Sequence, residues 1–362
     1  MTWSLFPATQ FDAHADSWAQ LNAETCATPL LQPEFVHPLL KELSSGKELL
    51  AIYRDDGHIA AMAILVPGGA GKWGTFQPSQ APLGMWMHRP DADLPALLAA
   101  LLRTLPGLPL VINLTQRDPA LEPRPPAAAT LASVDYIETA RVVIQGRFGD
   151  YWDGRGKNLR ANMKKQRAKL AKDGIAARLE VIRDPAAVAA AIVDYGRLET
   201  TGWKSGIGTA VDAGNAQGRF YQTMLTSFMQ RGNGCILRYW FDDKVVAMNL
   251  CIEGFGTMII LKTAYDESLG NQYSPAFMML EETCRDLFDN ASFRTLEFYG
   301  RVMEWHRRWT DDIRTIYHLT GYRWPVLLPL HKAIKNRKAA LSGQRGIALS
   351  APLGHAPSTS SE

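Results

Sequence analysis

The chain has 362 residues, with 46% hydrophobic residues, 21% charged residues and a formal net charge of +3. This length allows two or three domains with sizeable cores, and this composition is that of a globular protein, which excludes a largely disordered chain. Because the net charge is close to zero, binding of nucleic acid or another polyanion would require a local basic patch.

The cysteines and the apolar stretches exclude further classes. Cys26, Cys235, Cys251 and Cys284 stand far apart, so we expect neither a disulfide framework nor a metal site, and a reducing, cytoplasmic location fits. The N-terminus lacks a basic segment followed by an apolar one, so no signal peptide is expected. Residues 94–114 are the most apolar, but an arginine and three prolines interrupt them, so we expect no membrane span.

The first half of the chain predicts helices and strands in alternation. Residues 33–44 have helical apolar spacing, which ends before Gly46. Two strand-like runs then flank an Asp-Asp-Gly turn at 55–57, which predicts a β-hairpin. Further elements are a helix over 94–105 and strands over 109–114 and 136–145. The Pro-rich residues 117–129 are expected to form a surface loop.

A basic segment follows. Residues 155–172 contain eight lysines or arginines and no acid. Leu159, Met163 and Leu170 mark one narrow apolar stripe, which predicts a helix with a basic exterior that ends at Gly174. Three interpretations stay open: a solvated face, a contact with phosphate or polysaccharide, and a contact with nucleic acid. The absence of aromatic residues within the helix argues against stacking of single-stranded bases.

The second half predicts a longer series: strand, helix, helix, three strands, helix, strand, short helix and strand. The predicted strands cover 176–182, 235–241, 244–253, 257–265, 294–299 and 313–320. Helices are expected to begin near Asp184-Pro185, near Gly218 and at Pro275, with a Gly-rich loop at 205–215. After Leu330 the sequence becomes basic and low in complexity, so residues 331–362 are expected to form a mostly disordered tail.

Residues 257–284 combine a β-branched run, a polar loop and a helix. Ser274 stands at an N-cap position and Pro275 at the first helical position. The N–H groups and the positive dipole end at such a helix start favour an anion. The alternative is an ordinary strand–helix connection.

An internal repeat relates the two halves. Residues 33–66 and 219–252 share a layout at a constant offset of 186 residues, in which Gly46 falls on Gly232. A tyrosine, an apolar pattern and an Asp-Asp turn also correspond. Agreement of several features at one offset is better explained by duplication than by chance reuse of turn residues. We therefore expect two related α/β domains.

The element order of the second half resembles the GNAT acyltransferase fold. Further motifs, each weak alone, are similar to those of the cellulose-biosynthesis (CelD/BcsL-type) and Fem-like acetyltransferases. They are the basic helix from Lys157 to Leu170, Glu199 with Trp203-Lys204, Tyr265-Asp266, Tyr273 to Ala276, Glu297 before Gly300, and Trp305 with Trp309. The resemblance covers roughly residues 30–330. In one departure, Gln272 to Ala276 replace the phosphate motif Arg/Gln-x-x-Gly-x-Gly/Ala.

The resemblance implies an α/β (α+β) fold of two tandem GNAT-like domains, each a mixed, mostly antiparallel sheet flanked by helices. A non-catalytic N-terminal domain would cover 1–150, the acyltransferase domain 151–330 and the tail 331–362. The donor would be acetyl-CoA or another acyl-CoA, and no metal would be needed. Its pantetheine would lie in a gap between strands 257–265 and 294–299.

Particular residues follow from this resemblance. The implied cofactor-binding residues are Lys262, Thr263, Asn271, Gln272, Tyr273, Ser274 and Ala276. The implied acceptor-binding residues are Trp203, Lys204 and Trp305. The acceptor would be a small molecule or glycan with an amine or hydroxyl group, such as an amino sugar or polysaccharide-pathway intermediate.

Acyl transfer needs a base for the acceptor and a proton for the leaving thiolate. Glu199 is the first candidate base, because it continues an apolar helical stripe, and burial would raise the pKa of its carboxyl. In the alternative, Leu198 completes the stripe and Glu199 lies on the surface, paired with Lys204. Glu297 is the second candidate, since strand alternation would direct it away from its apolar neighbours; a solvated acid is the alternative.

Three further side chains are weaker catalytic candidates. His306 could relay a proton at neutral pH, although a lone His among arginines is more often an ordinary surface residue. Tyr265 or Tyr273 could donate to the departing thiolate, and both are equally suited to packing.

Three functions are compatible with these observations. The leading hypothesis is acyl-CoA-dependent N- or O-acylation, most simply N-acetylation. The second is a Fem-like transferase that uses aminoacyl-tRNA, which would be the one case for a nucleic-acid partner. The third is a degenerate, non-catalytic GNAT binding protein, favoured by the departure at Gln272 to Ala276. The sequence gives no indication of the oligomeric state.

Overall fold

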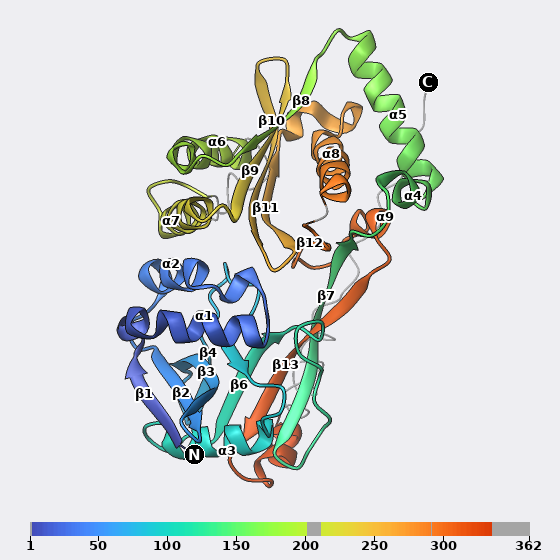
Figure 1. Ribbon diagram of the computed structural model, residues 1–362. Coiled ribbons are helices and arrows are strands. Elements are labelled where there is room, and N and C mark those ends of the chain that lie inside the picture. The colour runs from blue at the N-terminus through green and yellow to red at the C-terminus, as the bar shows by residue number, and fades with distance from the viewer. Residues whose placement is uncertain (1, 201–210, 291, 335–362) are drawn as a thin grey trace, which may run out of the picture.

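The structure is a computed structural model that describes residues 2–200, 211–290 and 292–334. Within these ranges the strands form one sheet in the order β1-β2-β3-β4-β6-β13-β7-β12-β11-β10-β9-β8, with β5 paired to β3. Figure 1 shows two lobes, the N-terminal half below and the C-terminal half above, joined by the long strands β7 and β13.

The N-terminal half contains the predicted elements, together with strands over 2–7, 72–75 and 86–88 and a helix over 15–24 that were not predicted. In chain order its elements are β1 (Thr2–Pro7), η1 (Ala8–His14), α1 (Ala15–Glu24), η2 (Pro29–Leu31), α2 (Pro33–Leu43), β2 (Leu49–Asp55), β3 (His58–Pro67), β4 (Lys72–Thr75), β5 (Trp86–His88), α3 (Leu94–Thr104), β6 (Val111–Arg117) and β7 (Leu131–Val143). The predicted hairpin is the antiparallel pair β2–β3.

The C-terminal half follows the predicted series closely. Its elements are α4 (Phe148–Asp153), α5 (Lys157–Lys172), β8 (Ala177–Ile182), η3 (Pro185–Ala187), α6 (Val188–Thr200), α7 (Ala216–Gln230), β9 (Gly234–Phe241), β10 (Lys244–Gly254), β11 (Thr257–Tyr265), η5 (Glu267–Gln272), α8 (Pro275–Asp289), β12 (Thr295–Glu297), α9 (His306–Trp309) and β13 (Ile313–Tyr322). Beyond β13, residues 327–334 are helical, and the rest of the predicted tail lies outside the described residues.

Both halves have the same sheet pattern. Four antiparallel strands, β1-β2-β3-β4 and β8-β9-β10-β11, are each followed by one parallel neighbour, β6 and β12. A parallel neighbour requires a crossover connection, and the helices α3 and α8 lie in these two crossovers. The expected fold class, two GNAT-like mixed sheets flanked by helices, is therefore confirmed.

The repeat extends to individual residue pairs. Tyr53 lies opposite Ala61 in the first hairpin, and Tyr239 lies opposite Ala247 in the second. Each pairing then shifts by one residue, and the two shifts fall at equivalent places. The two Asp-Asp turns also match, because Asp56 and its equivalent Asp242 have positive φ angles of 47° and 50°. Such detail at one offset supports duplication of a helix–hairpin unit.

The last strand of the chain joins the first sheet. Although β13 follows the elements of the C-terminal half, it lies between β6 and β7, antiparallel to both. The far end of β7 pairs with β12 in turn, so that Leu296 lies opposite Val142. Residues from both halves are thereby brought to the junction between β12 and β13.

Helices cover both faces of the upper sheet. On one face α6 and α7 pack above α2, where the rings of Phe35 and Phe220 meet edge to face with centroids 5.5 Å apart. On the other face lie α8 and, outside it, the basic helix α5. None of the helices in the described ranges is both long and apolar enough to cross a membrane.

Candidate functional site

A gap opens where β11 and β12 separate. The two strands pair in parallel from Thr257↔Thr295 to Ile259↔Glu297, after which β11 continues to Tyr265 on its own. Beyond this point the chain after Glu297 turns to β7, since the Phe298 N–H donates to the Ala140 carbonyl at 3.2 Å. This explains why the strand predicted over 294–299 ends at residue 297.

Two cavities lie on opposite sides of the gap. The first, of about 780 Å³, lies beside α8 and is called here the α8 cavity. The second, of about 480 Å³, is lined by both halves of the molecule and is called here the interface cavity. Ile260 and Phe298 line both cavities. These two side chains therefore form a partition between the α8 cavity and the interface cavity.

A β-bulge in β11 decides which side chains face each cavity. Ile260 lies opposite Cys251 and Lys262 opposite Leu250, so Leu261 is the extra residue. A bulge rotates the strand and interrupts its alternation. As a result Lys262 lines the interface cavity and Thr263 lines the α8 cavity. Of these two implied cofactor-binding residues, the structure places only Thr263 on the side of α8.

The start of α8 forms one wall of the α8 cavity. Ser274, Pro275 and Ala276 line it, at the positive end of a 15-residue helix. Ser274 occupies the predicted N-cap position, but its hydroxyl accepts a hydrogen bond from Gln166 Nε2 of α5 at 2.9 Å. The side chain of Ser274 therefore links α5 to α8. The backbone N–H groups at the start of α8 and the positive end of its dipole favour an anion at this wall.

The basic helix α5 is fixed beside this wall. Arg167 forms ion pairs with Glu281 and Glu282 of α8, at 3.0 Å each. Lys169 Nζ lies 5.2 Å from the ring centroid of Tyr273, whose hydroxyl donates to Asp173. Since Tyr273 lines the α8 cavity, α5 brings the ammonium group of Lys169 near the cavity wall, where it is paired with Asp173 at 3.1 Å.

A buried charge cluster lies at the base of the gap. The Arg314 guanidinium on β13 donates to Asp118 Oδ2 at 2.6 Å and Oδ1 at 2.7 Å, and to Glu297 Oε2 at 2.9 Å. Tyr299 Oη also donates to Asp118, at 2.8 Å. Asp118 follows β6 of the N-terminal half, so both halves contribute to the surroundings of Glu297.

Burial dominates the electrostatics of this cluster. It raises the pKa of Glu297 to about 7, against the lowering effect of Arg314. Burial also acts to raise the pKa of Asp118, but the bonds from Arg314 hold that pKa below its usual value. At neutral pH Asp118 is therefore ionised, while Glu297 exchanges its proton in the range suited to a general base.

Comparison with known proteins agrees with this geometry. Residues 157–307 match the family described as acetyltransferase (GNAT) domain. The matched region lies within the C-terminal half, which is therefore similar to a GNAT acetyltransferase domain. No curated protein sequence matches the chain.

Three solved structures share the fold, each with a TM-score of 0.54. The C-terminal domain (DUF2156) of a candidate lysylphosphatidylglycerol synthetase from Agrobacterium fabrum is 12% identical, with 85% of this chain and 92% of that chain covered. A conserved Bacteroides thetaiotaomicron protein of unknown function is 10% identical, with 86% and 96% covered. FemX is 8% identical, with 92% and 100% covered. These identities establish similarity of fold alone.

Glu199 is buried within the GNAT domain. Its Oε2 atom accepts the Val211 N–H at 2.7 Å, and its Oε1 atom lies 3.4 Å from Lys262 Nζ. Leu198 is buried as well. The alternative that placed Glu199 on the surface is therefore wrong, and of the two residues in this contact it is Lys262 that lines the interface cavity.

His306 is buried, contrary to the alternative of a surface residue. Its Nδ1 atom accepts the Met303 N–H at 2.9 Å, and its ring stacks on Trp305 with centroids 3.6 Å apart. Burial lowers its pKa to about 4, so the imidazole is neutral at pH 7. Trp305 itself lines the α8 cavity, as does Tyr265 at the end of β11.

Some predicted site residues cannot be placed. Trp203 and Lys204 lie outside the described residues, as does most of the predicted loop 205–215. Asn271 and Gln272 belong to the 3-10 helix η5, which leads into α8, but their side chains are not described.

Sequence reasoning missed the partners of Glu297. Asp118 is the second residue of the stretch expected to be a surface loop, yet its side chain is 0% exposed, and that of Arg314 is 10% exposed. The expectation for 117–129 is wrong at its start, because proline content reports turns and not tertiary burial. The available signal was a charged pair, Arg117-Asp118, directly at the end of an apolar strand.

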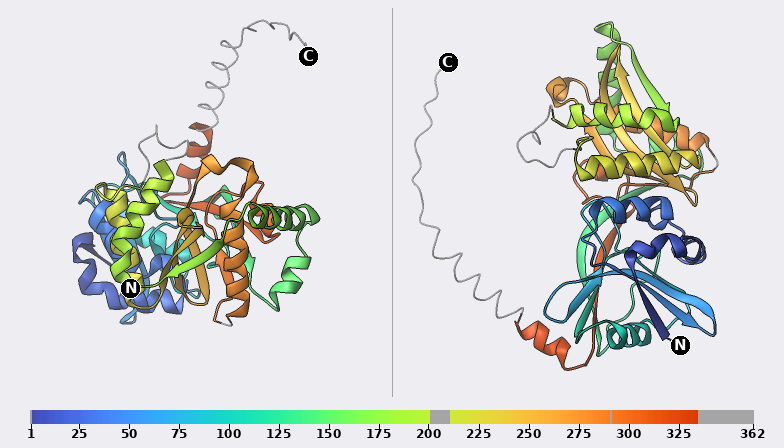
Figure 2. Two further views of the ribbon diagram at one scale, coloured as in Figure 1. Left: turned by 90° about the horizontal axis from the view of Figure 1, so that it is seen from above. Right: turned by 90° about the vertical axis from the view of Figure 1, so that its left-hand side faces the viewer.

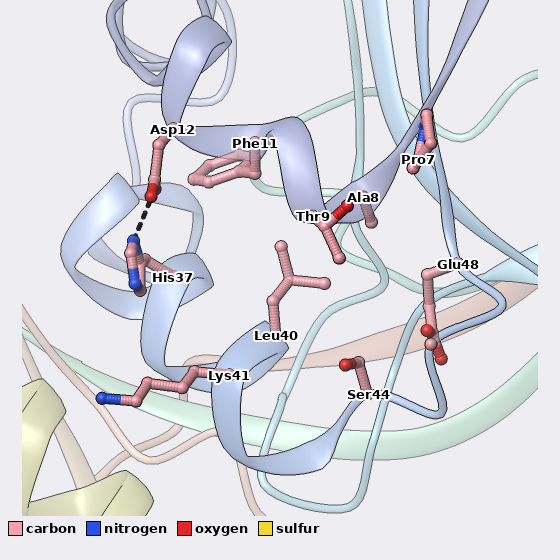
Figure 3. A pocket seen from close by; sticks show the side chains of 11 residues that line it. Pro7, Ala8, Thr9, Phe11, Asp12, His37, Leu40, Lys41, Ser44 and Glu48 are labelled. Atoms are coloured by element: carbon pink, nitrogen blue, oxygen red, sulfur yellow. Dashed lines mark ion pairs between the residues drawn. The ribbon is translucent and has the colours of Figure 1, made fainter.

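A third cavity, of about 350 Å³, lies in the N-terminal half between η1 and α2 (Figure 3). Its lining includes Asp12 and His37, which form an ion pair at 2.6 Å. It shares no lining residue with the α8 or interface cavity within the described ranges. In those ranges no group of three or more His, Cys, Asp or Glu residues is arranged to hold a metal.

Proposed function

We propose that this protein transfers an acyl group, most simply acetyl, from acyl-CoA to an amine or hydroxyl of an acceptor. One observation carries the proposal: the α8 and interface cavities meet at Ile260 and Phe298. A donor bound in one cavity and an acceptor bound in the other would meet at this partition. Holding two reactants in such an arrangement is itself a large part of catalysis.

The α8 cavity suits the donor. The start of α8 and Lys169 provide positive charge for the phosphates of CoA. The edge of β11 is not paired with β12 beyond Ile259, so its backbone amides would be available to pair with the amides of pantetheine. The bulge at Leu261 turns further backbone groups toward the partition, where they would polarise the thioester oxygen.

Glu297 is the proposed proton acceptor; it is not among the lining residues of either cavity, but the next two residues, Phe298 and Tyr299, line the interface cavity. The acceptor nitrogen or oxygen attacks the thioester carbon, its proton passes to Glu297, and the carbon–sulfur bond breaks. The departing thiolate takes a proton from water in the open α8 cavity. Tyr265 lies five residues beyond Ile260, about 16 Å along the strand. We therefore assign Tyr265 to the passage of pantetheine rather than to protonation of sulfur.

The lining of the interface cavity supports a polyhydroxylated acceptor. Amide, hydroxyl and ammonium groups line it, including those of Gln77, Gln116, Tyr136 and Lys262. Such donors and acceptors suit the hydroxyls of a sugar. An amino sugar or a polysaccharide-pathway intermediate is thus the proposed acceptor class, and its amine would be the acylated group.

The test is binding and turnover with purified protein. Acetyl-CoA and CoA should raise the melting temperature through preferential binding to the folded state, and amine acceptors should release free thiol. Ala276→Phe fills the α8 cavity and should abolish the shift, whereas Ala161→Phe, at an exposed position on α5, should preserve it. No shift with either ligand would contradict the proposal. A shift without thiol release from any acceptor would favour a non-catalytic binding protein.

The outer face of α5 supports a second candidate, a transferase that uses aminoacyl-tRNA. Lys164 and Lys165 are exposed there, whereas Arg167 is engaged with α8. Phosphate contacts of this kind make binding salt-dependent. The candidate predicts tRNA binding at low salt that weakens in the variant Lys164→Ala/Lys165→Ala. An absence of binding at low salt would exclude it.

A further inference from the structure

The segment after β13 exposes an apolar stripe. Val326, Leu330 and Ile334 are 65%, 53% and 47% exposed. Leu330 and Ile334 are four residues apart and so lie on one side of the helix 327–334, and Val326 directly precedes this helix. Trp324, 45% exposed, precedes this helix. The helix lies at the far end of the N-terminal half beside α3, and it is the orange-red helix at the foot of the right-hand view in Figure 2.

This helix is attached to the body of the protein. At its start Arg323 Nη1 donates to the Leu102 carbonyl at 2.7 Å, and the Arg323 N–H donates to the Leu110 carbonyl at 2.9 Å. Within it, His331 Nδ1 lies 2.8 Å from the hydroxyl of Tyr322. These bonds fix the inner side of the segment, so that the apolar stripe is held outward.

The charged residues in the sequence around the stripe are all basic. From Ile313 to Ser361 the sequence contains no Asp or Glu. Lysines and arginines are frequent in the same stretch; apart from Arg314, which is largely buried beside Glu297, they are Arg323, Lys332, Lys335, Arg337, Lys338 and Arg345. Lys332 is exposed on the helix itself. An exposed apolar stripe beside a run of basic residues is the pattern of a helix that lies in a membrane interface.

We propose that Trp324, Val326, Leu330 and Ile334 form a docking surface for an anionic membrane. The apolar side chains would enter the boundary between headgroups and acyl chains, and the basic residues would contact lipid phosphates. A second copy of the chain is a poorer occupant, because two surfaces of the same positive sign repel each other. The chain's own residues 335–362 are poorer for the same reason.

This placement leaves the proposed reaction unobstructed. The helix 327–334 lies beside α3 at the far end of the N-terminal half, and none of its residues lines the α8 or interface cavity. Membrane attachment would then bring the enzyme to acceptors at the lipid surface without covering either cavity. The inference goes beyond the proposed acyl transfer and does not depend on it.

Sedimentation with vesicles tests the proposal on the full chain. Vesicles of phosphatidylcholine with about one third phosphatidylglycerol should pellet the protein at least about tenfold more strongly than pure phosphatidylcholine vesicles. Raising the salt concentration to about 0.5 M should weaken this binding. The variant Leu330→Asp/Ile334→Asp should lose it. The control Val193→Asp alters a side chain that is 50% exposed on α6, and it should bind as the unchanged protein does.

Three outcomes would overturn the proposal. The first is an absence of pelleting with anionic vesicles, and the second is equal pelleting of Leu330→Asp/Ile334→Asp. The third is a concentration-dependent dimer that this variant abolishes while vesicles have no effect, since a second copy would then cover the stripe. The substituted residues are exposed, so melting temperatures close to that of the unchanged protein should show that the variants are folded.

Discussion

The guanidinium of Arg314 lies 2.9 Å from the carboxylate of Glu297 and binds it from a strand of the opposite half of the sheet. The same nitrogen also binds Asp118, which follows β6. The charge balance at Glu297 is therefore set by residues from both lobes. The N-terminal half would therefore be required for this charge balance even if it has no catalytic residue of its own, because its Asp118 binds Arg314.

We expect Glu297→Gln to remove the proton acceptor. Turnover should fall by about 100-fold or more, with a much smaller change in acyl-CoA affinity. Because burial raises the pKa of Glu297 to about 7, the unchanged enzyme should lose activity as pH falls through about 7, since the base becomes protonated. The variant should lack this limb of the pH–rate profile.

Glu304→Gln is the matched control, because Glu304 is exposed and lies close in sequence. It should retain both the turnover and the acidic limb. Equal turnover of Glu297→Gln and the unchanged enzyme would remove Glu297 from the proton transfer.

The raised pKa also predicts how stability depends on pH. A carboxyl whose pKa is higher in the folded than in the unfolded state binds more protons when folded, so stability falls as pH rises between the two values. For Glu297 this window runs from about 4.3 to about 7. The melting temperature of Glu297→Gln relative to the unchanged protein should therefore rise between these pH values. A constant difference would contradict the assignment.

Asp118→Asn tests the contribution of the N-terminal half. The negative charge of Asp118 raises the pKa of Glu297. Without this charge, the positive charge of Arg314 would stabilise the ionised form of Glu297 more strongly. The acidic limb of the pH–rate profile should therefore move to lower pH. The pH at the midpoint of this limb does not depend on the fraction of folded protein, so it can be measured even if the variant is less stable. An unmoved limb would show that Asp118 has only a structural role.

The local features of the site could be predicted from the sequence. The strand–loop–helix over 257–284 is fixed by composition and helix-start residues that act over a few positions, and α8 begins at Pro275 as expected. Glu297 was a candidate because strand alternation separates it from Leu296 and Phe298. The repeat could be recognised because both copies use the same turn residues.

The long-range features could not be predicted in this way. The insertion of β13 between β6 and β7 depends on sheet pairing between distant segments, which periodicity does not report. The pairing of Asp118 with Arg314 follows from that insertion. Similarly, the stripe on α6 left both a buried and a surface position open for Glu199, and its contact with Lys262 depends on how α6 packs against β11.

Glu199→Gln should act through Lys262. The substitution removes the carboxylate charge 3.4 Å from Lys262 Nζ, so we expect a higher KM for the acceptor and a smaller loss of kcat than in Glu297→Gln. Lys262→Met should give a similar effect. Because the two side chains are in contact, the loss in the double variant should be smaller than the sum of the losses in the two single variants. A loss of kcat equal to that of Glu297→Gln, with KM unchanged, would instead support Glu199 as the base.

Lys169→Ala tests the role of the basic helix α5. Lys169 lies beside Tyr273 at the wall of the α8 cavity, where its charge would attract the phosphates of CoA. We expect Kd for acetyl-CoA to rise about tenfold and the affinity for acetyl-pantetheine, which lacks these phosphates, to stay unchanged. Lys164→Ala is the control, because Lys164 lies five residues earlier and about 140° around the helix. Equal weakening of both donors by Lys169→Ala would mean that the substitution disturbs the cavity wall and that α5 does not bind phosphate.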